Sequence, residues 1–156
     1  MNSNKVYPIR ISPEILELLG PSLYTNIYYV LAELIANSYD ADAENVWLDL
    51  SGDSIIIEDD GHGMTYEETV HKYLEVAKST RNTEAESKSR KFQRPKMGRK
   101  GIGKLAALAI SSEVRVMTKS NGELSGFTLT RSVPQDGKLL PIKDSDIHFD
   151  NISKQR

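Results

Sequence analysis

The sequence has no cysteine, few histidines and no long apolar run, and each of these features excludes a class of protein. Without cysteine, the chain can hold no disulfide, thiolate zinc site, iron–sulfur cluster or cysteine nucleophile. The histidines, His62, His71 and His148, lack the close spacing of zinc ligands. The longest apolar runs are far shorter than the ~20 residues that cross a bilayer, and the N-terminus has no apolar secretory core. These features predict an intracellular, cytoplasmic protein that does not enter a membrane.

The length and composition fit one globular domain. The chain has 156 residues, of which 38% are hydrophobic and 27% are charged. A chain of this length can bury about two-thirds of the surface that it exposes when unfolded, which is enough for a single core. There is no internal repeat, low-complexity tract or clear linker, so we expect one domain over residues 1–156.

The formal net charge of −2 predicts no general attraction to nucleic acid or acidic membranes, but it conceals two segments of opposite charge. Residues 40–60 contain eight acids and no base, whereas residues 88–104 contain eight bases and no acid. Charge runs of this kind are most often solvated faces or flexible loops. The motifs that lie in these two segments decide whether the charges have another role.

The pattern of apolar residues predicts a mixed helix and strand domain. We expect helices over residues 13–19, 22–40, 65–76 and 101–110, with Ser22 at the start of the second and Thr65 as the cap of the third. We expect strands over residues 5–11, 45–50, 54–58, 113–119 and 124–131, with hairpin turns at residues 51–53 and at Asn121-Gly122. Pro8 places the first strand at a sheet edge. Residues 78–97 are polar and basic, which predicts a long mobile loop, and the pattern weakens from Ser132 onward.

Three polar side chains form a column beside the apolar stripe of the helix predicted over residues 22–40. At about 100° per residue, Glu33, Asn37 and Asp40 lie within about 60° of one another. In such a column a carboxylate can polarise a water, and a carboxamide oxygen can ligate a hard cation. The alternative is that these residues are ordinary solvated neighbours on the helix surface.

A second motif, Asp59-Asp60-Gly61-His62-Gly63-Met64, follows the strand predicted over residues 54–58. Its alternating glycines permit a tight turn and let a flat ligand approach the backbone without meeting a Cβ atom. Asp59, at the end of the strand, can accept a hydrogen bond from an exocyclic amine. The alternatives are a simple Asp-Gly turn or a calcium loop, although the downstream oxygen ligands of a calcium loop are missing.

A third motif, Gly98-Arg99-Lys100-Gly101-Ile102-Gly103-Lys104, is a basic glycine loop that precedes a predicted helix. Free backbone N–H groups at a helix start, with lysines nearby, form an anion site. Gly98, Gly103 and Lys104 fit a P-loop, but Leu105 stands where that motif has a serine or threonine for Mg²⁺. The alternative is a flexible loop without a ligand.

In their order and spacing, the three motifs resemble those of the GHKL ATPase superfamily, which includes gyrase B subunits, the ninety-kilodalton heat-shock chaperones, histidine kinases and MutL. The resemblance covers residues 22–130, and Ala77-Lys78-Ser79 is also similar to a sequence next to the lid in the chaperone branch. It implies an α+β fold, a two-layer α/β sandwich of the Bergerat type. Such a domain has a mostly antiparallel sheet with helices on one face.

The resemblance also implies that the chain binds ATP and Mg²⁺. By that resemblance, Glu33 is the catalytic base that orients the attacking water, Asn37 is the Mg²⁺ ligand and Asp59 binds the adenine amino group. The other nucleotide contacts that it implies are Asp40, Gly61, Gly63, Met64, Lys78, Ser79, Gly98, Lys100, Gly101, Ile102, Gly103 and Lys104.

A glutamate at position 33 is typical of the hydrolysing members, and the form of the third motif is similar to that of the chaperone-like and microrchidia-like branches. The expected function is therefore hydrolysis of ATP to ADP and phosphate, which closes the lid and drives a conformational or homodimerisation switch on a protein or DNA client. Two alternatives are a nucleotide-binding scaffold without turnover and a phosphotransfer domain like that of histidine kinases. A DNA-binding domain built on the basic segment is disfavoured, because Phe92 is its only aromatic residue.

The family pattern usually continues into a fourth motif, a Gly-Thr pair before a late strand, and then into a transducer domain that donates a lysine. The chain ends at Arg156 without this motif, and the threonines of Phe127-Thr128-Leu129-Thr130 come too early for it. We therefore expect an incomplete ATPase module, a fragment of a longer protein that is weak or inactive by itself.

Overall fold

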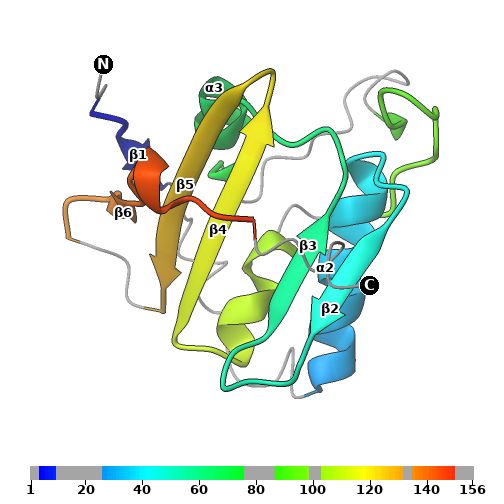
Figure 1. Cartoon of the computed structure of the whole chain (residues 1–156), viewed down its shortest axis with the longest axis horizontal. Helices are drawn as coiled ribbons and strands as arrows, with labels where there is room; N and C mark the ends of the chain where they lie inside the picture. The colour runs from blue at the N-terminus through cyan, green and yellow to red at the C-terminus, as the bar shows by residue number, and fades with distance from the viewer. Residues whose placement is uncertain (1–3, 10–25, 76–86, 99–102, 132–134, 150–156) are drawn as a thin grey trace.

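The computed structural model describes residues 4–9, 26–75, 87–98, 103–131 and 135–149 (Figure 1). It confirms an α+β fold in which every pair of described strands is antiparallel. The helix predicted over residues 13–19 lies outside the described residues. Within them, no helix is long and apolar enough to span a bilayer.

The longest strand pair confirms the predicted hairpin. Strand β4, Glu113–Ser120, pairs along its whole length with β5, Glu123–Thr130. The two residues between them, Asn121 and Gly122, have φ values of 52° and 80°. A tight turn of this handedness requires positive φ at both central positions, so the Asn-Gly pair sets the register of the hairpin.

A four-stranded sheet is built on this hairpin in the order β1-β6-β5-β4. Strand β6, Lys138–Pro141, pairs with β5, and β1, Tyr7–Pro8, is the edge strand, as Pro8 predicted. The Tyr66 hydroxyl donates to Val6 O at 2.6 Å and accepts from Val6 N at 3.1 Å, just before β1. The sequence did not predict β6, because only Leu139 of its residues is buried and the strand has no alternating pattern.

A second sheet pairs β2, Val46–Asp49, with β3, Ile56–Asp59, as the predicted hairpin over residues 45–58 requires. Figure 1 shows β3 beside β4, although the two sheets share no ladder. The segment after β3 joins them, because Met64 N donates to the Thr118 Oγ1 atom of β4 at 2.9 Å. The second motif therefore crosses from one sheet to the other.

Apart from the short 3-10 helix η4, Asp144–Asp146, the helices lie on one face of the strands. Helix α2, Ile27–Asp40, and the 3-10 helix η3, Gly103–Ala109, pack against each other behind β2, β3 and β4 in Figure 1. Helix α3, Tyr66–Glu68, continues as the π-helix η1, Thr69–Tyr73. The hydrophobic core lies between the four-stranded sheet and the helices and includes Tyr7, Leu74, Leu105, Phe127 and Leu129.

Three predicted helix boundaries or types need correction. Helix α2 starts at Ile27, because Asn26 is extended and its side chain accepts from Tyr28 N, so Ser22 is not its cap. The helix predicted over residues 65–76 is confirmed with its Thr65 cap, but it changes to π geometry after Glu68. The helix predicted over residues 101–110 is a tighter 3-10 helix over its described part.

Candidate functional site

Helix α2 brings the first and third motifs together. Glu33 is half-buried and faces η3, since a Cβ atom added at Gly103 would lie 2.2 Å from Glu33 Oε2. Asn37 follows one turn later on the same helix face and is also half-buried. A side chain at position 103 would displace the Glu33 carboxylate from this place beside the third motif.

Asp59 joins the second motif to the same helix. Its Oδ2 atom accepts from the Ser38 hydroxyl at 2.9 Å, and its Oδ1 atom accepts from Gly61 N at 2.9 Å. Ser38 is buried and directly follows Asn37, so Asp59 lies beside the part of α2 that carries the predicted metal ligand. A carboxylate has about four acceptor positions, and Asp59 is exposed, so it retains capacity for another donor.

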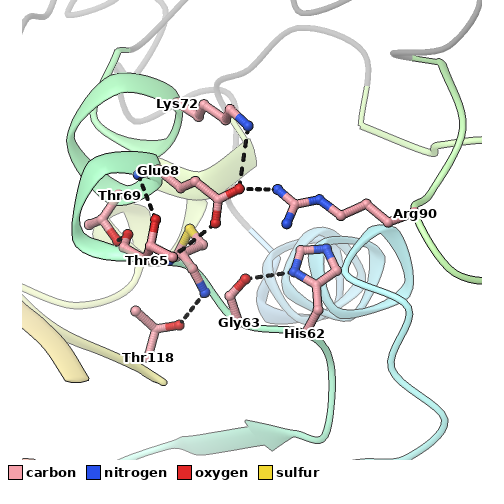
Figure 2. Close-up of polar contacts among 9 residues, drawn as sticks. His62, Gly63, Thr65, Glu68, Thr69, Lys72, Arg90 and Thr118 are labelled. Carbon is pink, nitrogen blue, oxygen red and sulfur yellow. Dashed lines mark hydrogen bonds and ion pairs between the residues drawn. The ribbon is translucent and has the colours of Figure 1, made fainter. Parts of the chain in front are cut away.

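The turn of the second motif is fixed by backbone contacts. His62 N donates to Ala41 O at 2.9 Å, just after the last residue of α2. Gly63 has a φ of +63°, and a Cβ atom added there would lie 2.0 Å from Lys119 O of β4. The turn therefore requires glycine at position 63 both for its backbone conformation and for its approach to the sheet. Figure 2 shows this turn, with the His62 ring turned toward Gly63 O.

The second motif leads directly into the capped start of α3. The Thr65 side chain accepts from Glu68 N, and the Glu68 carboxylate accepts from Thr65 N at 3.1 Å (Figure 2). Glu68 also forms ion pairs with Arg90 and Lys72. Although burial opposes its charge, the Thr65 N–H group and the Arg90 guanidinium lower the pKa of Glu68 to about 2.

The two described ends of the third motif lie along α2. The Asp40 carboxylate accepts from Met97 N at 2.8 Å and from Gly98 N at 3.0 Å. Gly103 lies at Glu33, seven residues or about 10 Å earlier on the helix. The site residues Lys78, Ser79, Lys100, Gly101 and Ile102, which the sequence predicts, lie outside the described residues.

Lys104 is turned toward the end of η1. Its Nζ atom donates to Lys72 O at 3.0 Å and to Glu75 O at 3.2 Å, and it lies 5.5 Å from the centre of the Tyr73 ring. Burial lowers the pKa of Lys104 to about 8, against the opposing charge of Glu75. Burial also raises the pKa of Tyr73 to about 12, and the hydroxyl of that residue donates to Lys104 O at 3.3 Å.

The described part of the loop predicted over residues 78–97 is irregular, as expected, with an isolated bridge between Lys88 and Pro95, and its mobility stays a prediction. Residues 87–98, which we call the basic turn, are folded by their own hydrogen bonds, such as Ser89 N to Arg94 O at 2.8 Å and Lys96 N to Ser87 O at 2.9 Å. Several of its bases contact groups within the chain. Arg90 pairs with Glu68, Lys91 Nζ lies 2.9 Å from Glu44 Oε1, and the Arg94 guanidinium donates to Ala43 O at 2.8 Å.

Sequence reasoning missed Ser38 and Asp42, which hold the site together. Ser38 lies between Asn37 and Tyr39 in the first motif, and a buried hydroxyl there needs a partner, but the sequence does not say which one. In the sequence, Asp42 is distinguished only as one acid of the run over residues 40–60. No local pattern could have revealed that its carboxylate receives hydrogen bonds from residues about 50 positions later.

Two surface cavities lie near the motifs. One of about 240 Å³ is lined by Asp42, Glu44, Asp60, Gly61, His62, Arg90 and Lys91. The other, of about 370 Å³, is lined by Thr65, Glu67, Glu68, His71, Lys72, Arg90 and Asn121. Both lie beside the second motif, and among the described residues neither is lined by Glu33, Asn37 or Asp59.

The donor set suits Mg²⁺ bound with a nucleotide better than a metal held by protein alone. Across the described ranges, no group of three or more His, Cys, Asp or Glu side chains could hold a metal ion. Mg²⁺ usually takes one or two protein oxygens and completes its shell with phosphate and water. The half-buried Asn37 carboxamide, one turn from Glu33, fits this limited role.

Comparisons with known proteins agree with the three motifs. The chain is 35% identical over 127 residues to a putative type II restriction enzyme HgiDII of Herpetosiphon aurantiacus, which covers 81% of the chain and 20% of that protein. It is 30% identical over 159 residues to the chaperone protein HtpG of Halalkalibacterium halodurans, covering 87% of the chain and 25% of that protein. HtpG of Coxiella burnetii is 32% identical over 133 residues, covering 70% of the chain and 21% of that protein.

The chain thus spans about a fifth to a quarter of the length of these relatives. A family profile described as histidine kinase-, DNA gyrase B- and HSP90-like ATPase matches residues 24–156, a range that contains all three motifs. The α+β fold of the chain agrees with that match, and so do the contacts that all three motifs make at α2. The chain belongs to this family, the GHKL ATPases, as an ATPase domain.

Proposed function

We propose that this domain binds ATP with Mg²⁺ and hydrolyses it to ADP and phosphate. The observation that carries the proposal is the convergence of the three motifs on α2. Gly103 contacts Glu33, Ser38 binds Asp59, and Asp40 binds the Gly98 backbone. The proposed base and metal ligand therefore lie on one helix, and the proposed adenine acceptor and the two ends of the glycine loop contact that helix.

Asp59 is proposed to select adenine. Its two hydrogen bonds, from Ser38 and Gly61, fix the direction of the carboxylate before any ligand arrives. A fixed carboxylate with an unused acceptor position can bind an exocyclic amino group, whereas a carbonyl oxygen at the same place would be repelled. Gly61, Gly63 and Met64 are proposed to form the wall of the adenine pocket.

Glu33 is proposed to hold the attacking water and accept its proton during in-line attack on the γ-phosphate. When bound, Mg²⁺ supplies charge neutralisation at the phosphate oxygens, and Asn37 contributes an oxygen ligand. The N–H groups of residues 98–103, with Lys78, Ser79 and Lys100, are proposed to bind the phosphates. Lys104 is proposed to support this loop through its bonds to Lys72 and Glu75, and to contact phosphate only if those bonds open.

ATP turnover is proposed to close the glycine loop as a lid and to drive a conformational or homodimerisation switch. The relatives differ in what their names say they act on, since one is a chaperone and another a restriction enzyme. A protein client and a DNA client are therefore both proposed. We also propose that residues 1–156 form one domain and that it acts in the cytoplasm.

The proposal is tested by separating binding from turnover. By titration calorimetry with Mg²⁺-ATP, Asp59→Asn is expected to lower affinity at least about tenfold, because a carboxamide replaces one acceptor with a donor. Glu33→Gln is expected to bind ATP within about twofold of wild type but to release no phosphate. Asp53→Asn, in the exposed turn between β2 and β3, is the matched control and is expected to change neither value.

Each other outcome has a defined meaning. Equal ATP affinity in wild type and Asp59→Asn would refute the adenine assignment. Binding without phosphate release, also in the full-length protein, would favour a nucleotide-binding scaffold. Transfer of labelled phosphate to the protein itself would favour the phosphotransfer alternative.

A further inference from the structure

The basic turn, residues 87–98, is attached to the end of α2 by a buried carboxylate. Asp42 Oδ2 accepts from Lys91 N at 2.6 Å, and Asp42 Oδ1 accepts from Phe92 N at 3.1 Å. The Asp42 residue is 5% exposed. Both oxygens of one carboxylate are therefore used to hold two consecutive backbone N–H groups of the turn.

The backbone of Asp42 is in an unfavourable conformation. Its φ is 62°, in the left-handed region that residues other than glycine, asparagine and aspartate rarely adopt, and that is less favourable for aspartate than for glycine. Such a conformation persists only where the surroundings enforce it. Burial of the carboxylate opposes its charge, yet the hydrogen bonds from Lys91, Ser89 and Phe92 lower the pKa of Asp42 to about 2. The side chain thus stays ionised and the turn stays bound.

Further contacts fix the turn to the same part of α2. The Arg94 guanidinium donates to Ala43 O and lies 4.8 Å from the Tyr39 ring centre and 4.5 Å from that of Phe92. A guanidinium close to two aromatic rings gains cation–π attraction from each of them. At the other end of the turn, Asp40 binds the N–H groups of residues 97 and 98.

We propose that Asp42 is a positioning residue for the phosphate-binding loop. By fixing the basic turn to the end of α2, it sets the place from which the chain enters the third motif at Gly98, which Asp40 then holds. The consequence for ATP rests on the proposed function. The basic turn is accordingly a fixed support for the loop. Arg90 and Lys91 help to attach it through their ion pairs with Glu68 and Glu44.

A competing explanation is that position 42 needs only a residue that tolerates the left-handed backbone conformation, and that the Asp42 carboxylate does not position the loop. Two substitutions separate the explanations. Asp42→Gly relieves the backbone strain and removes the anchor, whereas Asp42→Asn keeps the shape and tolerates the conformation but loses the charge and one acceptor. Asn121→Gly, at φ 52° in the β4–β5 turn, is the matched control for glycine at a left-handed position.

The experiment measures amide hydrogen exchange at Lys91 and Phe92 together with the affinities for Mg²⁺-ATP and for adenosine. In Asp42→Gly, exchange at both amides is expected to accelerate at least about tenfold, and ATP affinity is expected to fall about tenfold. Adenosine affinity is expected to stay within about twofold, because Asp59 is untouched. Asp42→Asn is expected to show a smaller change of the same kind, and Asn121→Gly none.

The outcomes are distinguishable. If Asp42→Gly leaves exchange and ATP affinity unchanged, Asp42 serves the backbone alone and the inference is overturned. If ATP and adenosine affinities fall together, the effect is general damage to the fold, which also overturns it. If the wild type binds neither ATP nor adenosine, the proposed function fails, and the positioning role fails with it. If the wild type binds ATP and Asp42→Gly binds it equally well, only the role of Asp42 is refuted.

Discussion

The two sides of the site are held by different kinds of contact. At the second motif, a local bond from Gly61 N to the Asp59 side chain is combined with distant contacts to Ala41 and to Lys119 of β4. At the third motif, Gly98 is held by the Asp40 side chain, 58 positions earlier. Both arrangements need the folded domain, but the second motif also depends on the backbone conformation of its own glycine, Gly63, at φ +63°. Substitutions on the two sides should therefore fail in different ways.

The largest expected effect is at the second motif. Gly63→Ala should lower the free energy of unfolding by about 4 kcal/mol, because the methyl group would overlap Lys119 O and φ is positive. Gly122→Ala, with φ +80° but no atom within 4 Å, isolates the backbone cost and should lose about 1 kcal/mol. Gly52→Ala, without either problem, should change little in urea denaturation. Equal losses at positions 63 and 122 would contradict the close approach to β4.

Glu68 joins the two sides, since it caps α3 and pairs with Arg90 of the basic turn. Its pKa of about 2 lies below the value in the unfolded chain, so its stabilisation is present above about pH 4.5 and is lost as pH falls toward 2. Glu68→Gln should therefore cost about 2 kcal/mol at pH 7 and almost nothing near pH 2. Denaturation of both proteins between pH 2 and 7 tests this prediction. A stability difference between wild type and Glu68→Gln that does not depend on pH would contradict it.

Lys104 should give a smaller effect with the same sign, in a higher pH range. Its pKa of about 8 in the folded protein lies below the ordinary lysine value, so the unfolded chain binds more protons between about pH 8 and 10. The unfolding free energy should consequently rise by about 1 kcal/mol from pH 8 to 9.5 in wild type and stay flatter in Lys104→Met. Measurements stop there because Tyr73, with a pKa raised to about 12, destabilises the fold between pH 10 and 12. Parallel pH curves for both proteins would contradict the burial of this ammonium.

The smallest effect concerns the stacking of Arg94. Arg94→Lys keeps the charge but loses the planar group next to Tyr39 and Phe92, and it should cost about 0.5 kcal/mol. Arg115→Lys is the control, because its ion pair with Glu113 is more than half exposed on both sides and should contribute little. An equal or larger loss for Arg115→Lys would contradict this account of the basic turn.

Sequence reasoning predicted the parts of the fold that short-range rules determine. The β4–β5 hairpin followed from Asn121-Gly122, and the Thr65 cap and the β2–β3 pair from equally local signals. The family motifs identified the ATPase fold, and α2 carries Glu33, Asn37 and Asp40 as the pattern indicated.

The remaining features depend on contacts that no short pattern contains. The 3-10 geometry of η3 accompanies its packing on α2, and β6 forms only because β5 offers an edge to a short, mostly exposed segment. The contacts of the basic turn could not be predicted, because its partners Asp40 and Asp42 lie about 50 positions or more earlier in the sequence. The contacts of Glu33 with Gly103 and of Lys104 with Glu75 are likewise consequences of tertiary packing.

The phenol of Tyr66 has a consequence for behaviour in concentrated solution. It occupies both the donor and the acceptor of Val6 next to the edge strand β1. An edge with unsatisfied backbone groups invites strands from other molecules and so promotes aggregation. A single hydroxyl from the helix after the second motif thus shields these groups from pairing with strands of other molecules. A longer edge strand would need a charged side chain or a bulge to prevent such pairing.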